Sequence, residues 1–138
     1  MPRVKLKLPK VYHFQTKLKL RIYDLNYGAH MGNDSVLSIV HEARIQFFQS
    51  LNLKERDFYG LSLLMADSAV VYKKEGFYGD ELDIKIAVSE FFTCGFELFY
   101  LVKNGDHEIA RVKTGLVCYD RSENKISKLP LDFATNFS

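Results

Sequence analysis

Hydrophobic and polar residues alternate along several stretches of the chain, and this period of two predicts β-strands. The first stretch runs from Tyr12 to Tyr23 and is followed by turn-forming residues at 24–28. A nearly continuous apolar stretch covers 63–72, and alternation returns at 82–88, 96–102 and 109–119. Turn residues at 76–80 and 104–106 separate these stretches, and the second of these, Asn-Gly-Asp, predicts a hairpin.

A different period covers residues 36–51, where apolar side chains fall on one face of a helix. Asn33 is placed to cap this helix, and Asp34 falls in its first turn, where the positive end of the helix dipole favours a carboxylate. Ile39, Ile45 and Phe48 widen the apolar face beyond an ordinary stripe. The pattern therefore predicts a helix enclosed by its surroundings.

The predicted order is a strand, one long helix and then an antiparallel meander of four or five strands, which indicates an α+β fold with one sheet curled around one helix. We expect a single domain over residues 1–138, with 1–11 as an N-terminal arm. One helix covers one face of such a sheet, so the excess of aromatic residues predicts a partner surface, in the simplest case a two-fold dimer. These residues are Phe77, Tyr78, Phe91, Phe92, Phe99 and Tyr100.

Composition excludes several classes of function. The net charge of +2 is too small for a nucleic-acid-binding surface, and no stretch reaches the roughly 20 apolar residues of a membrane helix. The first residues have no apolar core of signal-peptide length, so we expect a cytoplasmic protein. Cys94 and Cys118 lie in strand-like contexts and are expected to be reduced core thiols, and no ligand spacing suggests a metal site.

The residues between the first strand and the helix carry the candidate chemistry. Asn26, Gly28, His30, Gly32 and Asn33 occupy this junction. Backbone amides at a helix N-terminus can stabilise a carbonyl oxygen as it becomes an oxyanion, and small residues let a substrate approach the backbone. The junction is therefore suited to binding a carbonyl oxygen that becomes an oxyanion.

These residues resemble the signature of the hot-dog acyl-CoA thioesterases of the 4-hydroxybenzoyl-CoA thioesterase type. That signature reads Asp, two residues, Gly-His-Val-Asn-Asn and, about eight residues later, Glu-x-Ala-Arg or a close variant. His30 and Asn33 fall on its His and second Asn, Glu42-Ala43-Arg44 follow in register, and 78–82 is similar to the family's Tyr-Gly-Asp-Glu-Leu. The resemblance runs from about Tyr12 to Leu129. It implies a hot-dog fold, in which an antiparallel sheet wraps one long central helix, and an acyl-CoA or acyl-carrier-protein thioester as substrate, in a homodimer or homotetramer. Coenzyme A then enters only as part of the substrate, and no cofactor is expected.

The chain departs from this signature where the family carries its catalytic Asp, because that position is Asn26. An amide neither attacks a thioester nor takes a proton from water, although it can orient water. Three other carboxylates are candidates for the general base. Asp24 is more simply a solvated strand end, and Glu42 could instead form a structural bond to Arg44 or a loop amide. Asp67, in an apolar stretch, is expected to be buried, either beside His30, Asn26 or a cleft, or satisfied by backbone amides.

Three hypotheses follow. The first is thioester hydrolysis by water, with amides near Gly32 and Asn33 as the oxyanion hole and Asn26, His30 and either Asp67 or Glu42 organising the water. In this hypothesis the acyl group lies against Phe47, Phe48, Leu64 and Met65. The second, favoured by the amide at Asn26, is a non-catalytic module that binds acyl-CoA or an acyl carrier protein. The third is a dehydratase that uses His41 and Glu42, which point about 100 degrees apart on a helix and so do not converge within one chain.

Overall fold

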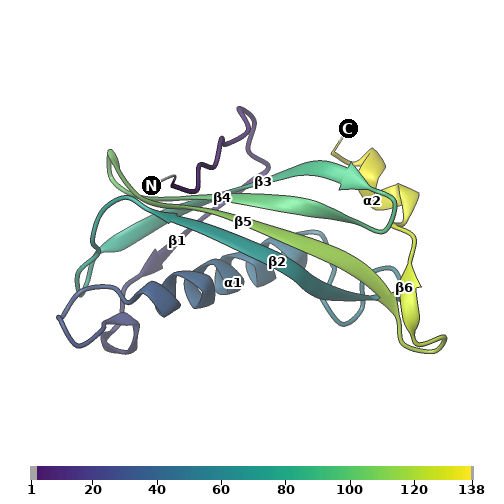
Figure 1. Ribbon diagram of the computed structural model, residues 1–138, viewed down its shortest axis with the longest axis horizontal. Coiled ribbons are helices and arrows are strands. Elements are labelled where there is room, and N and C mark those ends of the chain that lie inside the picture. Colours follow the sequence, from purple (N-terminus) through teal and green to yellow (C-terminus); the bar gives the residue numbers. More distant parts are fainter. Residues whose placement is uncertain (1–2, 138) are drawn as a thin grey trace.

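One antiparallel sheet curves around one long helix in the computed structural model, which describes residues 3–137 (Figure 1). In chain order the elements are β1 (Phe14–Lys19), the 3-10 helix η1 (Ile22–Asp24), α1 (Asn33–Ser50), β2 (Ser62–Tyr72), β3 (Glu81–Phe92), β4 (Gly95–Asn104), β5 (His107–Asp120), β6 (Lys125–Ser127) and α2 (Leu131–Thr135). The strand order is β1-β3-β4-β5-β2, and β6 pairs with β5. The predicted α+β architecture is confirmed.

The core lies between α1 and the concave face of the sheet. Val36, Val40, Ala43 and Phe47 of α1 are buried there against inward-facing residues of β3, β4 and β5. Burial of such side chains is the main favourable contribution to folding, on the order of 1.5–3 kcal/mol for each large one. Leu37, on the other face of the helix, stays 41% exposed.

A polar network crosses this core. The guanidinium of Arg44, on α1, donates to Glu55 Oε1 at 2.7 Å and to Tyr100 Oη at 3.0 Å. The Tyr100 hydroxyl also shares a hydrogen bond of 2.8 Å with Thr114 Oγ1. Burial of the Tyr100 ring raises the pKa of its hydroxyl, so it stays protonated and can act as a donor. The prediction that Tyr100 belongs to a partner surface is therefore wrong, because its ring is fully buried in this network.

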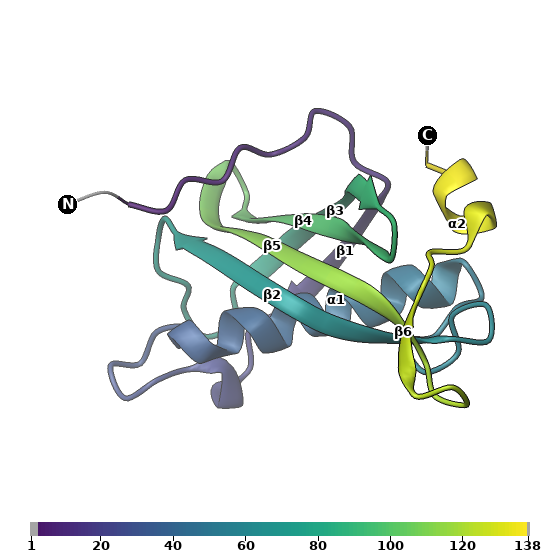
Figure 2. The same cartoon turned by 45° about the vertical axis from the view of Figure 1, so that its right-hand side comes forward.

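The N-terminal arm and α1 lie on opposite sides of the sheet (Figure 1 and Figure 2). From Arg3 onward the arm crosses the convex face before β1 begins, and Arg111 Nη1 donates to the carbonyl oxygen of Leu6 at 3.0 Å. At the other end of the arm His13 Nδ1 accepts the amide of Val88 at 3.0 Å. Residues 1, 2 and 138 of the predicted single domain lie outside the described residues.

Several boundaries differ from the prediction. The first strand ends at Lys19, because Asp24 Oδ2 accepts the Arg21 amide at 2.8 Å and turns residues 22–24 into η1. Helix α1 starts at Asn33 with Gly32 as its N-cap, so Asn33 is the first helical residue and not the cap. Among residues 3–137 no helix is long and apolar enough to cross a membrane.

Cys118 gives the fold a defined response to alkaline pH. Burial, and then the neighbouring Cys94, raises the pKa of the Cys118 thiol from 9.0 to about 11. The unfolded thiol ionises above pH 9 and the folded one only near pH 11, so ionisation favours the unfolded chain across this window. We expect the free energy of unfolding to fall by about 2 kcal/mol between pH 9 and pH 11 on this account.

Urea denaturation of the wild type and of Cys118→Ala at pH 8, 9, 10 and 11 measures this contribution. The substitution removes a buried side chain and lowers stability at every pH, so the informative quantity is the slope with pH. The slope of the variant is expected to be shallower than that of the wild type. Equal slopes would show that the thiol ionises alike in the folded and unfolded chains.

Candidate active site

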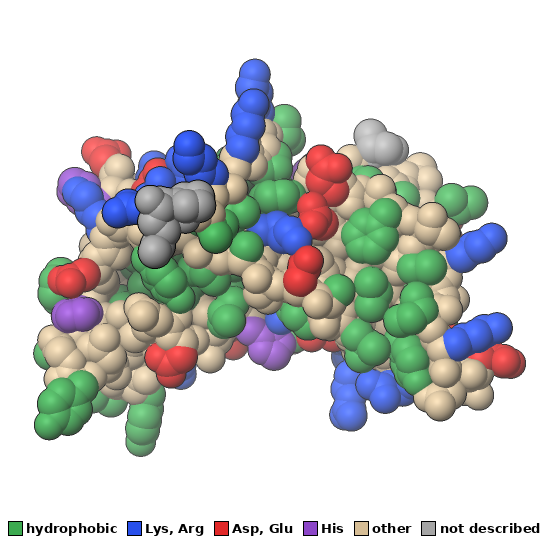
Figure 3. All heavy atoms as spheres, in the orientation of Figure 1, with side chains coloured by type: hydrophobic (Ala, Val, Ile, Leu, Met, Phe, Trp, Pro, Cys, Tyr) green, Lys and Arg blue, Asp and Glu red, His purple; other side chains and the backbone are tan. Residues whose placement is uncertain are grey.

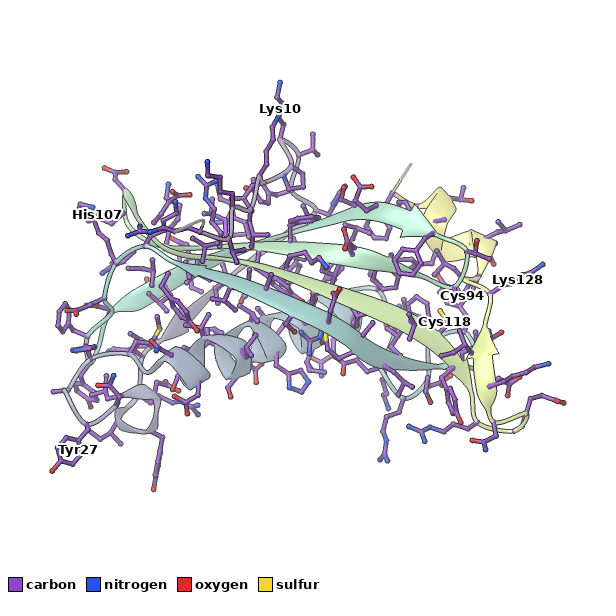
Figure 4. The ribbon with its side chains drawn as sticks, in the orientation of Figure 1. Lys10, Tyr27, Cys94, His107, Cys118 and Lys128 are labelled. Carbon is purple, nitrogen blue, oxygen red and sulfur yellow. The ribbon has the colours of Figure 1, made fainter. Side chains whose placement is uncertain are left out.

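The junction between β1 and α1 closes into a small hairpin. The amide of Asn26 donates to the carbonyl of His30 at 2.8 Å, and the amide of Ala29 donates to the carbonyl of Asn26 at 3.0 Å. Ala29 has a φ of 65°, a left-handed conformation that favours glycine, which is the residue that the resembled signature carries at this position. The hairpin thus presents residues 26–30 as a tight loop at one end of the molecule, from which Tyr27 projects into solvent (Figure 4).

Asn26 lies beside the start of α1. Its Oδ1 accepts the amide of Gly28 at 2.8 Å, which fixes the side chain over the loop. A Cβ at Gly32 would lie 3.5 Å from the Asn26 Cβ and only 2.7 Å from Asp34 Oδ1. A larger residue at position 32 would therefore displace the carboxylate of Asp34 from the first turn and crowd Asn26.

The N-terminus of α1 has no side-chain cap. The amide of Gly32 donates to the Asp24 carbonyl at 3.0 Å, and the amide of Ser35 donates to the Gly32 carbonyl at 3.1 Å. The amides of Asn33 and Asp34 lie between these two and remain as donors at the positive end of an 18-residue helix. Amides near Gly32 and Asn33 were predicted to form an oxyanion hole; the Gly32 amide is already engaged by Asp24, so the amides that could take this role are those of Asn33 and Asp34.

His30 faces a carboxylate that the sequence did not indicate. Its Nε2 lies 3.7 Å from Glu75 Oε1, and its ring packs edge-on against Phe77 with centroids 6.4 Å apart. Two backbone contacts hold residues 75–77 beside His30. One is an isolated antiparallel β-bridge between His30 and Phe77, and the other is the Met31 amide, which donates to the Gly76 carbonyl at 2.6 Å. Residues 75–77 thus form a second wall of the loop.

Gly28 is needed for the position of the imidazole. A Cβ at this position would lie 3.0 Å from His30 Nε2 and 3.4 Å from Asn26 Oδ1. The first contact is tighter than most Cβ contacts, so a side chain here would shift the ring by a few tenths of an ångström, whereas the second is an ordinary van der Waals contact. Asn26, Gly28, His30, Gly32 and Asn33, all predicted as site residues, are therefore brought together.

Glu42 lies away from this group. It follows Asn33 by nine residues on α1, which places it about 14 Å further along the helix axis. Glu42 Oε2 accepts from Gln46 Nε2 at 2.9 Å, and the predicted alternative of a bond to Arg44 is wrong, since Arg44 binds Glu55. Glu42 lines a cavity of about 540 Å³ between η1 and α1.

Asp67 also lies away from the junction, and the expectation that it is buried is wrong. Its side chain is 63% exposed and accepts from Lys113 Nζ at 2.7 Å, while Lys113 also pairs with Glu97 at 2.8 Å. A bulge between Met65 and Asp67 shifts the register of β2 by one residue, so Asp67 pairs with Gly115 on the convex face. Within one chain Asp67 and the α1 junction are on opposite faces of the sheet.

The predicted acyl pocket is also wrong in part, because two of its residues are buried in the core. Phe47 and Phe48 are fully buried in the core, with exposures of 1% and 0%, and are not available to a ligand. Met65 instead lines a cavity of about 280 Å³ between α1 and β2, which also reaches Leu37, Ser68, Arg44 and Thr114. The apolar residues of its lining are Leu37 and Met65, and the rest are polar or charged: Ser38, His41, Ser68, and Arg44 and Thr114 of the core network.

Among the described residues no three His, Cys, Asp or Glu side chains are grouped so that they could hold a metal ion. The chemistry that this junction supports is therefore built on polar side chains and backbone amides. It combines helix amides able to bind a developing negative charge, an imidazole with a carboxylate beside it, and an amide side chain between them.

Comparison with known proteins identifies the fold and the family of the chain. The family model described as the thioesterase-like superfamily matches residues 20–137. A 1,4-dihydroxy-2-naphthoyl-CoA thioesterase from Synechocystis superposes with a TM-score of 0.81 at 19% identity, over 90% of this chain and 94% of that one. A hypothetical protein from Aquifex aeolicus superposes with a TM-score of 0.82 at 22% identity, over 91% of this chain and 100% of that one. A probable thioesterase from Escherichia coli superposes with a TM-score of 0.71 at 20% identity, over 85% of this chain and 90% of that one. The search of curated proteins found no match. These superpositions confirm the hot-dog fold.

Proposed function

Because the chain belongs to the thioesterase-like superfamily, we propose that it hydrolyses an acyl-CoA thioester at the junction of β1 and α1, as an enzyme of the 4-hydroxybenzoyl-CoA thioesterase type. The observation that carries this proposal is the uncapped start of α1 at the end of the loop that holds His30 beside Glu75. An acyl group on a carrier protein presents the same thioester and is a second form of the substrate.

In the proposed reaction the thioester carbonyl oxygen accepts hydrogen bonds from the amides of Asn33 and Asp34. Water attacks the carbonyl carbon, and the imidazole of His30 takes a proton from that water. The carbon–sulfur bond then breaks, and the proton passes to the departing sulfur, giving a carboxylic acid and a thiol. Glu75, whose Oε1 lies 3.7 Å from His30 Nε2, holds the orientation of the imidazole, and Asn26 holds the water by its amide group.

The acyl group fits the cavity of about 280 Å³ between α1 and β2. This volume is at the small end of ligand pockets and suits a short or single-ring acyl group. The thiol-bearing carrier then leaves the site past the end of β2, where Tyr72 Oη donates to the carbonyl of Asn33 at 3.1 Å.

We also propose that two copies of the chain pair along β2. In the described part of the chain this 11-residue strand is bonded on one side only, to β5, and Met65 and Asp67 are exposed along its length. A long unpaired edge of this kind is suited to pairing with a second copy. Since β2 ends beside Asn33, a copy on this edge would close the junction from solvent.

A second function is favoured by one observation, the amide at Asn26. Position 26 carries an amide, and the two predicted replacements for the family's Asp, Glu42 and Asp67, are both remote; a module that binds acyl-CoA without hydrolysing it needs no carboxylate there. Binding without turnover would then raise the thermal stability of the protein as RT ln(1 + [L]/Kd).

A panel of short, long and aromatic acyl-CoAs, assayed for free thiol, tests the proposal. We expect turnover of at least one short or aromatic acyl-CoA well above spontaneous hydrolysis. Thermal stabilisation by acyl-CoA without turnover of any member would support the binding module, and absence of both effects would contradict both functions.

A further inference from the structure

Basic residues from distant parts of the sequence gather at one groove on the convex side of the sheet. The groove has a volume of about 470 Å³ and lies between the N-terminal arm and the end of β2. Its basic residues are Arg3, Lys5, Lys7, Lys73 and Arg111. Figure 3 shows Lys and Arg side chains gathered where the arm begins. None of the described residues that line the groove is Asp or Glu.

Among the described residues, one of the five basic side chains of the groove has a carboxylate partner. Arg111 is paired with Glu108, at 3.0 and 3.2 Å, and its remaining bond to the Leu6 carbonyl fixes the arm. Within residues 3–137 the other four basic side chains of the groove form no ion pair, whereas Lys17 and Lys113 elsewhere each contact two carboxylates. Like charges held together without counter-charges are unfavourable, and a bound polyanion removes that cost.

The groove adjoins the candidate active site. Tyr72, which lines it, is the last residue of β2 and donates from its hydroxyl to the carbonyl of Asn33 at the start of α1. One tyrosine side chain therefore separates the groove from the proposed oxyanion hole. Val4, 61% exposed, and the half-buried Val71 add apolar surface between the charges.

We propose that this groove binds the 3′-phosphoadenosine diphosphate portion of coenzyme A. The choice of coenzyme A as the ligand rests on the proposed function. The position of the subsite rests on the basic residues of the groove. A phosphate and a diphosphate match the four unpaired cations by charge-assisted hydrogen bonds, and the apolar surface suits the adenine ring. Arg3, Lys5 and Lys7 of the groove lie before residue 20, where the family match begins, and Lys73 and Arg111 lie within the match.

The experiment compares two double variants with equal changes of net charge. Lys5→Glu/Lys7→Glu changes the groove, and Lys125→Glu/Lys128→Glu changes the opposite end of the molecule, where Figure 4 shows Lys128. The probe is 3′-phosphoadenosine 5′-phosphate, with binding measured by calorimetry at low salt. We expect the groove variant to weaken binding on the order of tenfold and the control to change it less than twofold. Equal weakening in both variants, or none in either, would overturn the proposal.

A second measurement separates the groove from the catalytic proposal. KM for an acyl-CoA is expected to rise about tenfold in the groove variant, while hydrolysis of the same acyl group on N-acetylcysteamine, which lacks phosphates, stays unchanged. If the wild type hydrolyses neither thioester yet binds the nucleotide as expected, the function fails and the groove stands. If the wild type hydrolyses both thioesters and the groove variant shows the same KM for each, the proposed groove site is contradicted and the proposed function stands. A rise in KM confined to an acyl carrier protein would assign the groove to that partner instead.

Discussion

Replacing Asn26 with aspartate is expected to raise kcat for acyl-CoA hydrolysis about 100-fold, an ordinary contribution for a well-placed general base. The side chain is exposed, and its Oδ1 already accepts the Gly28 amide at 2.8 Å. A carboxylate keeps that bond and offers a second oxygen to the attacking water. The positive end of α1, next to position 26, favours the added negative charge, so the loop is expected to keep its conformation.

The measurement is kcat and KM for the best acyl-CoA of the panel, with circular dichroism as a check of folding. Asn124→Asp is a matched control, because Asn124 Oδ1 also accepts a hydrogen bond, from Tyr119, in a turn remote from the junction. This control is expected to leave kcat unchanged. A folded Asn26→Asp protein with an unchanged or lower kcat would show that a carboxylate at this position does not assist the reaction.

The secondary structure was largely predictable because each element carries its own period. The strand at 82–88 alternates strictly and lies within β3, the strand at 96–102 lies within β4, and the turn at 104–106 contains Gly105 with a φ of 59°. The C-terminal α2 was missed, since five residues are too few to show a helical period. The end of β1 was misplaced because alternation continues into η1, where Asp24 bonds to the Arg21 backbone.

The site was predictable only where it is local in sequence. Asn26, His30 and Asn33 lie within eight residues, and one loop brings them together. Asp67 was misplaced for a specific reason, because strict alternation from Leu63 and Met65 would turn it toward α1. The bulge before it inserts one residue and reverses its direction.

Glu75 gave no local signal at all. It stands in a charged turn between β2 and β3, a position that usually means solvent exposure, and it lies 45 residues after His30. Only the bridge between His30 and Phe77, and the bond from Met31 to Gly76, bring it to the junction. Pairings across such sequence distances depend on sheet register, which a single sequence does not specify.

Replacing His30 with alanine is expected to lower kcat by a factor of about 100 to 1,000, because the proposed reaction then loses its proton acceptor. KM is expected to change much less, since the helix amides and the cavity beside α1 remain. Added imidazole is expected to restore part of the rate, because it can occupy the space left by the ring. A loss of folding alone would produce no such rescue, so this measurement separates a chemical role from a structural one.

Glu75→Gln separates the carboxylate from the imidazole that it orients. It is expected to lower kcat about tenfold with little change in KM, and Glu75→Asp is expected to recover part of that loss, because a shorter carboxylate still attracts the ring. His107→Ala, in the hairpin labelled in Figure 4, removes an imidazole that contacts Lys74 Nζ at 3.0 Å and has no part in the proposed reaction, so this control is expected to retain activity. If His30→Ala kept its kcat while Asn26→Asp still raised the rate, water activation would belong to the position of Asn26 alone. The imidazole would then act only as a support for the loop, held between Gly28 and Phe77.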